Sequence, residues 1–287
     1  MDDDKKVLAC VDQSSYANSV TDYATWAAQR MQAPMELLHV IDRHPRLEAE
    51  QDHSGTIGLD AQESLLRQLS EEDAARSRAA RDVGRVYLNT LRERAIKAGA
   101  DIVDVRQRHG KLESTLAELQ GDTRLFVLGR RGASTGATGR DLGRNLKWVV
   151  RSVDKPVLAV PEKFRSPSRV LFAFDGSSVT RRSLVMIAAS PLLKSLPIHL
   201  LMVGKEQAQG PKQLKEAQEV LEAVGFSVSA SIESGDPETV VGRAVKSLQC
   251  DLQVMGAYSH SPLRGLFMGS KTTDLLRSAA VPTLLLR

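Results

Sequence analysis

The sequence predicts two tandem α/β domains, each a parallel sheet of five strands flanked by helices. Apolar runs alternate with segments of helical periodicity along both halves, which is the pattern of βαβ units. Residues 7–40 also align without a gap on residues 170–203, and residues 125–129 resemble residues 252–256. A repeat of this length indicates a duplicated domain and not a short solenoid unit.

Length and composition agree with this organisation. At 287 residues the chain has room for about two domains, and no apolar run approaches the roughly 20 residues that span a bilayer. The first strand follows Met1 closely, with no secretory signal before it, so we expect a cytoplasmic protein. Cys10 and Cys250 lie in different halves within apolar surroundings, which predicts two buried, reduced thiols.

The charge balance is compatible with an anionic partner but does not choose one. The formal net charge is +4 and the isoelectric point is about 9.1. Interleaved basic and aromatic residues, which would favour nucleic-acid binding, are absent from the sequence. We therefore expect neither a nucleic-acid partner nor a membrane partner.

The first half begins with a strand over residues 7–11, whose continuous apolar run is typical of a strand buried on both faces. Ser14 or Ser15 can cap the helix that follows, and Pro34 ends it. A second strand is predicted over residues 35–41. Six residues form the apolar face of the helix: Val20, Tyr23, Ala24, Ala27, Ala28 and Met31.

A long polar stretch follows the second strand. Within it, Ser70 and Asp73 have the spacing of a capping box, and an apolar stripe then continues a helix to Gly99. The stripe consists of Val83, Tyr87, Leu91 and Ala95. The remaining predicted elements of this half are a third strand (100–105), a helix (112–120), a fourth strand (125–128), a helix (142–150) and a last strand (157–160).

The second half repeats this order in fewer residues. Its third strand alternates strictly between apolar and polar residues, which predicts a solvated face and a place at a sheet edge. Helices are predicted over residues 214–224 and 240–248. The five predicted strands are 170–174, 198–203, 226–232, 252–255 and 283–286.

We place the two domains at residues 1–161 and 168–287, because prolines and charges interrupt the pattern between them. Almost all of the difference in length lies between the second and third strands. The first half has residues 42–99 there, and the second half has residues 204–225.

Three features of each half reach the same edge of its predicted sheet. Asp12 and Asp175 end the first strands, and Val40 and Val203 end the second strands. The third feature is a glycine-rich segment that leaves the fourth strand. In a doubly wound parallel sheet, ligands bind at the carboxyl ends of the strands, where the strand order reverses. These features therefore mark the candidate site, although both aspartates are also suited to capping the next helix.

In the second half the glycine-rich segment starts at Gly256. Glycine lets the backbone approach a phosphate closely. Gly269 and Ser270, at the start of a helix, offer N–H groups, the positive helix end and a hydroxyl to an anion, and Lys271 adds a cation. The alternative is that the segment is only a tight turn in a domain that no longer binds.

The whole chain resembles a tandem universal stress protein, with two family domains in one polypeptide. The family's nucleotide-binding signature is G-x2-G-x9-G-S/T after the fourth strand, and the second half keeps its spacing with Ser259 in place of the second glycine. The resemblance implies a Rossmann-like, adenine nucleotide alpha hydrolase-like fold and ATP binding, with or without Mg²⁺. Asp175 would then lie by the ribose and the Val203 backbone by adenine. Four residues would hold the ribose and phosphates: Gly256, Ser259, Gly269 and Ser270.

The first half departs further from this signature. Gly129 and Gly132 keep the first two glycines, but Gly143 comes one residue late, and Arg144 and Asn145 replace the hydroxyl residue. A first-half site would use Asp12, Val40, Gly129, Gly132 and Gly143. A basic surface offers another way to hold an anion here: Arg124, Arg130, Arg131, Arg140, Arg144, Lys147 and Arg151.

Enzyme signatures fail on spacing. There is no G-x-S-x-G elbow and no His/Cys set with metal-ligand spacing, so we expect neither a catalytic nor a metal site. The segment from Gly265 to Thr272 resembles the end of a P-loop but lacks lysine directly after its second glycine. We therefore expect a binding protein and not an enzyme.

Two functions of different classes remain. The first is an adenine-nucleotide-binding stress-response protein whose second half binds ATP. The alternative is a protein-interaction scaffold without nucleotide control, favoured by the departure at Gly143 and by the enlarged residues 42–99. The family resemblance also implies that strands 157–160 and 283–286 join the halves into a pseudo-dimer, which leaves a further homodimer open.

Overall fold

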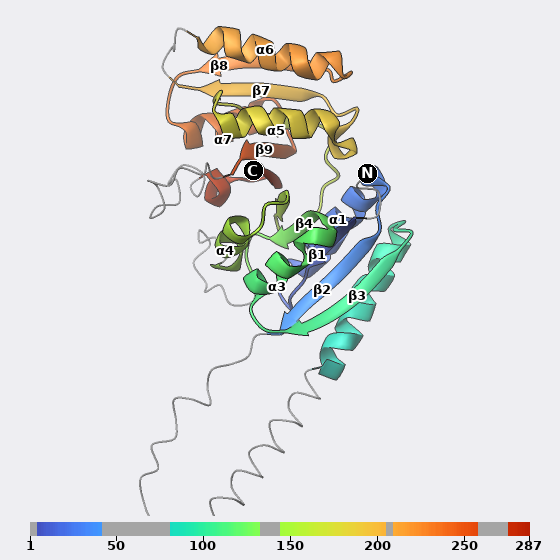
Figure 1. The fold of residues 1–287 in the computed structure, drawn as a ribbon. Helices are drawn as coiled ribbons and strands as arrows, with labels where there is room; N and C mark the ends of the chain where they lie inside the picture. Colours follow the sequence, from blue (N-terminus) through green and yellow to red (C-terminus); the bar gives the residue numbers. More distant parts are fainter. Residues whose placement is uncertain (1–4, 42–80, 133–143, 205–208, 258–274) are drawn as a thin grey trace, which may run out of the picture.

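The computed structural model describes residues 5–41, 81–132, 144–204, 209–257 and 275–287. Ten strands of these residues form one sheet, in the order β3-β2-β1-β4-β5-β10-β9-β6-β7-β8 (Figure 1). The strands of the first half are β1 (Lys6–Cys10), β2 (Met35–Ile41), β3 (Val103–His109), β4 (Thr123–Gly129) and β5 (Val157–Val160). Those of the second half are β6 (Val170–Ala173), β7 (Ile198–Val203), β8 (Val228–Glu233), β9 (Leu252–Gly256) and β10 (Thr283–Leu286).

Each half contributes five parallel strands in the same relative order. The chain moves from β1 outward to β2 and β3, then returns to the other side of β1 for β4 and β5. The second half does the same from β6. The predicted duplication of a five-stranded parallel sheet is confirmed.

The two halves join through their last strands. β5 and β10 pair antiparallel, with Leu284 opposite Leu158 and Thr283 opposite Ala159. This pairing confirms the predicted pseudo-dimer. It also places β3 and β8 at the two edges of the shared sheet, as the alternating pattern of the third strand in the second half predicts.

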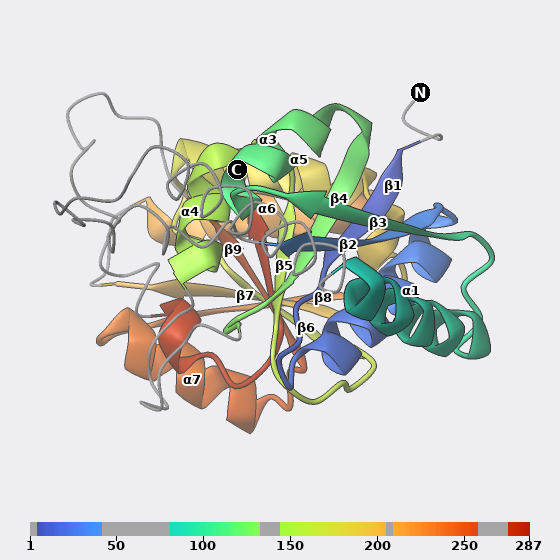
Figure 2. The ribbon, with the colours of Figure 1, turned by 90° about the horizontal axis from the view of Figure 1, so that it is seen from below.

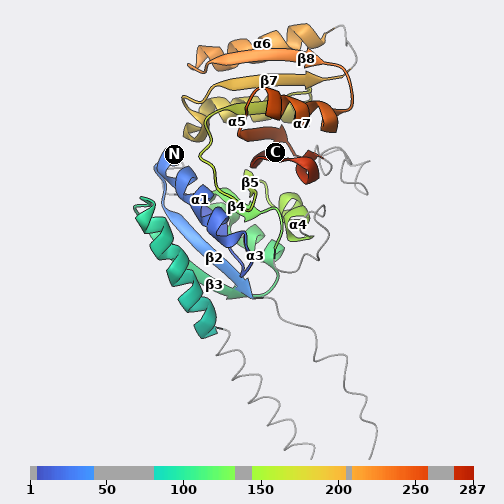
Figure 3. The same ribbon diagram turned by 180° about the vertical axis from the view of Figure 1, so that it is seen from behind.

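Helices cover both faces of the sheet (Figures 2 and 3). One face carries α1 (Ala17–Met31), the helix of residues 81–97, α5 (Ser178–Ala189), the short 3-10 helix η3 (Pro191–Leu193) and α6 (Gly210–Ala223). The other face carries α3 (Leu112–Leu119), followed by the short 3-10 helix η2 (Gln120–Asp122), then α4 (Arg144–Ser152) and α7 (Pro237–Ser247).

The central strands are mainly apolar because both of their faces are covered. In β1, Val7, Leu8 and Ala9 are all fully buried. Val7 and Ala9 belong to the core under α1, whereas Leu8 belongs to the core under α3 and α4. Alternation along a strand therefore distributes one apolar run between two cores.

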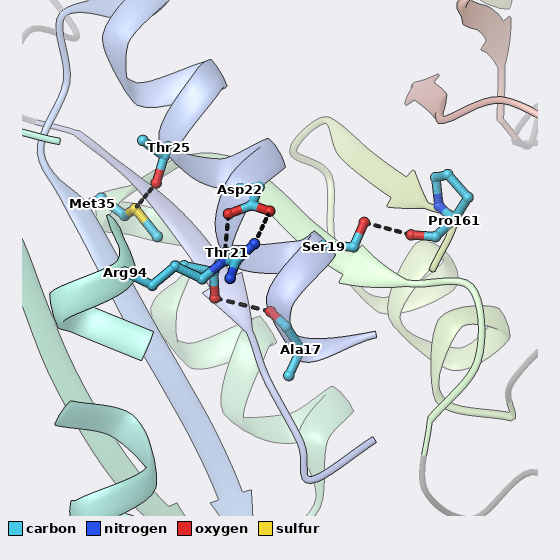
Figure 4. A network of polar contacts seen from close by, with 8 residues as sticks. All are labelled: Ala17, Ser19, Thr21, Asp22, Thr25, Met35, Arg94 and Pro161. Atoms are coloured by element: carbon cyan, nitrogen blue, oxygen red, sulfur yellow. Dashed lines mark hydrogen bonds and ion pairs between the residues drawn. The ribbon is translucent and has the colours of Figure 1, made fainter. Parts of the chain in front are cut away.

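Polar side chains on α1 form hydrogen bonds within the helix or with neighbouring elements (Figure 4). The Ser19 hydroxyl donates to the Pro161 carbonyl at 2.6 Å, and the Thr21 hydroxyl donates to the Ala17 carbonyl at 2.9 Å. Asp22 accepts two hydrogen bonds from Arg94, both 2.7 Å long. These contacts fix α1 against the end of the first half and against the helix of residues 81–97.

Two local predictions in the first half are wrong. The third strand begins at Val103, later than the predicted 100–105, because the amide of Ala100 still bonds back to the Ala95 carbonyl and closes the preceding helix. In the apolar stripe of that helix, Leu91 and Ala95 are buried as predicted, but Val83 is 57% exposed and Leu88 is buried instead. The predicted capping box at Ser70 and Asp73 lies outside the described residues.

The predicted cap of α1 is also wrong. The helix begins at Ala17 after Tyr16, with no side-chain cap, because Ser14 takes part in another arrangement. Its hydroxyl donates to Asp12 Oδ1 at 2.5 Å and accepts from the Tyr16 amide at 3.3 Å. In the second half the equivalent Ser177 does cap α5, accepting from the Thr180 amide.

Candidate functional site

The strand order reverses at the same place in both halves. β1 lies between β2 and β4, and β6 lies between β7 and β9. At such a position the connections leave the sheet in opposite directions, so a crevice opens beyond the carboxyl ends of the strands. A pocket lies there in each half.

The pocket of the second half has a volume of about 190 Å³. Asp175, Val203 and Gly256 line it, so the structure brings together three of the predicted site residues. Its apolar lining includes Leu201 and Met255. The other predicted residues, Ser259, Gly269, Ser270 and Lys271, lie outside the described residues.

Asp175 both organises its loop and faces the pocket. Its Oδ1 accepts from the Ser177 amide at 3.0 Å and from the Thr180 hydroxyl at 2.7 Å. Among the described residues nothing donates to its Oδ2, and the side chain is exposed. One carboxylate oxygen therefore stabilises the start of α5, and the other is accessible from the pocket.

Gly256 is required by packing as well as by its place in the signature. A Cβ atom at this position would lie 2.9 Å from Val179 Cγ1 and 3.2 Å from Thr180 Cγ2. Gly129 has the same role in the first half, where a Cβ would lie 2.9 Å from Tyr16 Cβ. The first glycine of each segment thus lets a helix start against the end of the fourth strand, whether or not a ligand binds.

The pocket of the first half is smaller, about 80 Å³. Asp12, Val40, Gly129 and Gly132 line it together, whereas Gly143 lies outside the described residues. Gly132 approaches the Asp12 carboxylate so closely that a Cβ there would lie 2.6 Å from Oδ2. The segment after β4 therefore closes against the aspartate that ends β1.

Sequence reasoning missed two aromatic residues behind this pocket. The Tyr87 hydroxyl donates to the Asp12 carbonyl, and the Tyr87 ring meets His39 edge-on, with centroids 6.0 Å apart. His39 Nδ1 lies 2.9 Å from the Val11 carbonyl, so that nitrogen carries the proton. Burial, with a smaller contribution from Asp12, raises the pKa of Tyr87 to about 12, so the hydroxyl stays protonated as a donor.

Tyr87 appears in the sequence only as a member of a helical stripe, and no local signal separates it from core residues. It comes from the helix of residues 81–97, which belongs to the enlarged part of the first half. This helix therefore contacts the backbone of a pocket residue directly, a contact that the sequence did not predict.

The predicted basic surface is not one surface, because its members turn to different neighbours. The Arg130 guanidinium reaches the Val281 carbonyl of the second half at 3.4 Å, and burial lowers the pKa of this guanidinium. Arg151 stacks over Trp148 at 5.9 Å, and Arg124 reaches the Met31 carbonyl at 3.4 Å. Of the group, Arg131 lines the pocket. Arg140 and the side chain of Arg144 lie outside the part of the chain that the structure describes.

The two thiols are free, but only Cys250 is fully buried as predicted. Cys10 is half-buried because it lines the first-half pocket. Burial, and to a lesser degree Glu36 and Asp12, raises the pKa of the Cys10 thiol far above its ordinary value. Such a thiol is a poor nucleophile, so Cys10 serves as pocket lining.

Within the described ranges no three His, Cys, Asp or Glu side chains gather as a metal site would require. In the same part of the chain, none of the helices has both the length and the apolar character needed to cross a bilayer.

Comparison with known proteins gives consistent results. The sequence profile of the Universal stress protein family matches residues 4–161 and again residues 167–287. A universal stress protein of Synechocystis sp. is 34% identical over 286 residues, which are 99% of this chain and 100% of that protein.

Two solved structures share the fold over nearly the whole chain. A universal stress protein from Archaeoglobus fulgidus superposes with a TM-score of 0.70 at 20% identity, covering 98% of each chain. A protein from Pseudomonas aeruginosa, described as a putative universal stress protein, superposes with a TM-score of 0.60 at 18% identity. That match covers 99% of this chain and 94% of the other.

Proposed function

Because this chain belongs to the universal stress protein family, we propose that its second half binds an adenine nucleotide and that the protein acts as a stress-response regulator. The observation that supports this proposal is the second-half pocket, about 190 Å³ in volume and lined by Asp175. Oδ2 of Asp175 has no hydrogen bond to any described residue, so it can accept a hydrogen bond from a ribose hydroxyl.

The lining of this pocket suits a nucleoside. Leu201 and Met255 supply apolar surface for a purine ring, and the end of β7 at Val203 offers backbone polar groups to the base edge. The proposed phosphate-binding residues, Ser270 and Lys271 among them, follow β9 in sequence and lie outside the described residues. ATP, with or without Mg²⁺, is the ligand we propose.

The first-half pocket is a weaker candidate for the same ligand. It is less than half as large as the second, and Gly132 closes against Asp12. We therefore propose one nucleotide per chain, held by the second half.

Isothermal titration calorimetry with ATP and Mg²⁺ tests the site, with Asp175→Ala as the variant and Asp12→Ala as its matched control in the first half. We expect one ATP per chain, retained in Asp12→Ala and weakened by roughly tenfold or more in Asp175→Ala, since a hydrogen bond to a charged group is lost. Circular dichroism confirms that α5 still forms. Equal affinity in both variants, or no heat with the natural chain, would exclude the proposed site.

We propose that the protein binds nucleotide without a dedicated catalytic step. Of the described residues that line the second-half pocket, none is a histidine, and we assign the free Oδ2 of Asp175 to the ribose and not to the phosphates. A general base must be positioned at the attacking water. Single-turnover assays at ATP concentrations that saturate the protein should therefore show ADP formation no faster with the natural chain than in buffer without protein. Rapid ADP release that Asp175→Ala abolishes would instead identify an ATPase.

A second candidate function is protein interaction through the first half. Val83 and Val86 lie one turn apart on the helix of residues 81–97 and are 57% and 65% exposed. Exposed apolar residues grouped in this way are typical of an interaction surface. The double substitution Val83→Lys with Val86→Lys should remove partners from affinity purifications of the full chain, whereas Val185→Lys on α5 should leave them.

A further inference from the structure

A cavity of about 440 Å³ lies between the two halves, on the side of the sheet that carries α1 and α5. Its floor is formed by side chains of β4 and β10, Leu125 from the first half and Leu284 and Leu286 from the second. Met31 and Ile187 line it from the ends of α1 and α5. The cavity is distinct from both strand-end pockets, with which it shares no lining residue.

The cavity has the size and location of a small-molecule site. Ligand pockets typically have volumes of roughly 300–1,000 Å³, are mainly apolar and often lie at domain interfaces. The leucines of its floor are nearly inaccessible themselves, with Leu125 only 1% exposed. A ligand there would be shielded from water on the side of the sheet.

The rim of the cavity is positively charged. Arg124 and Lys155 line it together with Asp154. Asp154 is neutralised by an ion pair with Arg287 at 3.1 Å, whereas Lys155 has no ion pair with any described residue. Arg124 makes one long hydrogen bond, 3.4 Å, to the Met31 carbonyl. The two cations can therefore meet an anionic group that enters from solvent.

Contacts between the halves hold this cavity open. Arg30 Nε donates to the Leu192 carbonyl at 2.5 Å, and another nitrogen of the same guanidinium donates to the Lys194 carbonyl. β5 and β10 join the halves beneath the cavity. Because the walls come from separate halves that are already fixed, a ligand gains contacts without first ordering the site.

We propose that this interdomain cavity binds one amphipathic anion, a carboxylate on a single saturated hydrocarbon chain. The chain would lie against the partly exposed Pro156 and Met186 above the leucine floor, and the carboxylate would meet Arg124 and Lys155. This inference does not depend on nucleotide binding, because it uses none of the residues of the strand-end pockets.

Calorimetric titration of the full chain with dodecanoate, below its micelle concentration and without nucleotide, tests the proposal. Dodecan-1-ol is the matched neutral probe. We expect one dodecanoate per chain and weaker binding of the alcohol by roughly tenfold, because the alcohol cannot form the charge-assisted contacts. Lys155→Gln combined with Arg124→Gln should remove this difference.

Two substitutions on α5 test the location. Met186→Trp enlarges a side chain that lines the cavity. Val185→Trp makes the same enlargement at the preceding residue, which is 65% exposed and does not line the cavity. Met186→Trp should abolish dodecanoate binding, and Val185→Trp should preserve it. A thermal melt verifies that both variants fold.

Three results would overturn the proposal. One is uptake of many dodecanoate molecules per chain, and another is binding unchanged by Met186→Trp, since both indicate non-specific adsorption. The third is a dimer in sedimentation experiments that Met186→Trp dissociates, which would make a second copy of the chain the occupant. ATP binding by the same preparation is measured separately, so failure here leaves the nucleotide proposal standing.

Discussion

Asp175 and Gly256 show that a single residue at a strand end can satisfy two requirements. Asp175 uses Oδ1 to stabilise the start of α5 and leaves Oδ2 toward the pocket. Gly256 provides space for Val179 and Thr180 and also lines the pocket. The fold by itself therefore requires these residue types, whether or not a ligand binds.

Gly256→Ala should destabilise the protein by about 1–3 kcal/mol, since its Cβ would overlap Val179 in a packed region. Gly242→Ala in α7 is the matched control, because its Cβ would meet nothing within 4 Å and alanine favours helices. Urea unfolding at neutral pH measures both. The packing explanation fails if Gly256→Ala is as stable as Gly242→Ala.

His199 should make stability depend on pH. Its ring nitrogens lie 2.8 and 2.9 Å from the hydroxyls of Ser229 and Ser231, and burial lowers its pKa, an effect that Glu233 opposes. In the unfolded chain this histidine has a pKa near 6.5. As the pH falls, it therefore binds a proton in the unfolded chain before it does so in the folded chain. Acidification from about pH 7.5 to pH 5.5 should therefore lower Tm, and the loss should be smaller in His199→Gln. Equal losses in both proteins would show that His199 does not contribute.

The first helices of the two halves begin differently because the equivalent serines, Ser14 and Ser177, form different hydrogen bonds. Ser177 caps α5, whereas Ser14 binds Asp12 and leaves α1 to begin at Ala17. Tyr16 lies beside Gly129 and lines the first-half pocket, and its equivalent, Val179, lies beside Gly256 in the second half.

Ser177→Ala should lower the free energy of unfolding by about 1 kcal/mol, because the Thr180 amide loses its cap. Ser178→Ala, at the adjacent exposed position without a side-chain hydrogen bond among the described residues, should change it little. Ser177→Asn should restore most of the loss, since asparagine is an equally good cap. Chemical unfolding followed by far-UV circular dichroism distinguishes these outcomes. Equal effects of the two alanine substitutions would contradict the cap.

At the scale of the whole molecule, the ten strands of the described residues form one sheet with a common core on each side. Residues of both halves, such as Leu158 and Leu284, belong to the same buried cluster. Ser19, Arg30 and Arg130 add hydrogen bonds across the junction or to the end of β5. We therefore expect the halves to unfold together, although each has the strand order of a complete domain.

Leu284→Ala tests this coupling, because both tryptophans, Trp26 and Trp148, lie in the first half. Loss of this buried side chain should cost about 2–5 kcal/mol. Because the halves share the junction, tryptophan fluorescence and far-UV circular dichroism should shift together to lower urea concentration. Val224→Glu, at an exposed position of the second half, should shift neither signal. A fluorescence transition that stays in place would mean that the halves unfold independently.

The order of elements followed from the sequence because it depends on local patterns. The fully apolar run of β1 reflects burial on two faces, and the alternation in β8 reflects an edge. The strands β5, β7 and β10 have the predicted bounds. Predictions at helix ends, such as the cap at Ser14 or Ser15, were less accurate because one competing hydrogen bond moves the boundary.

For the candidate site, the sequence alone determined that Asp175, Val203 and Gly256 belong together, because the carboxyl ends of parallel strands meet at one edge. Only the tertiary structure decided that Tyr87 contacts Asp12 and that Arg130 turns to the other half. It also decided that a cavity opens between the halves. These features depend on how helices and halves pack at long range. The local pattern of one segment does not specify the surface against which that segment packs.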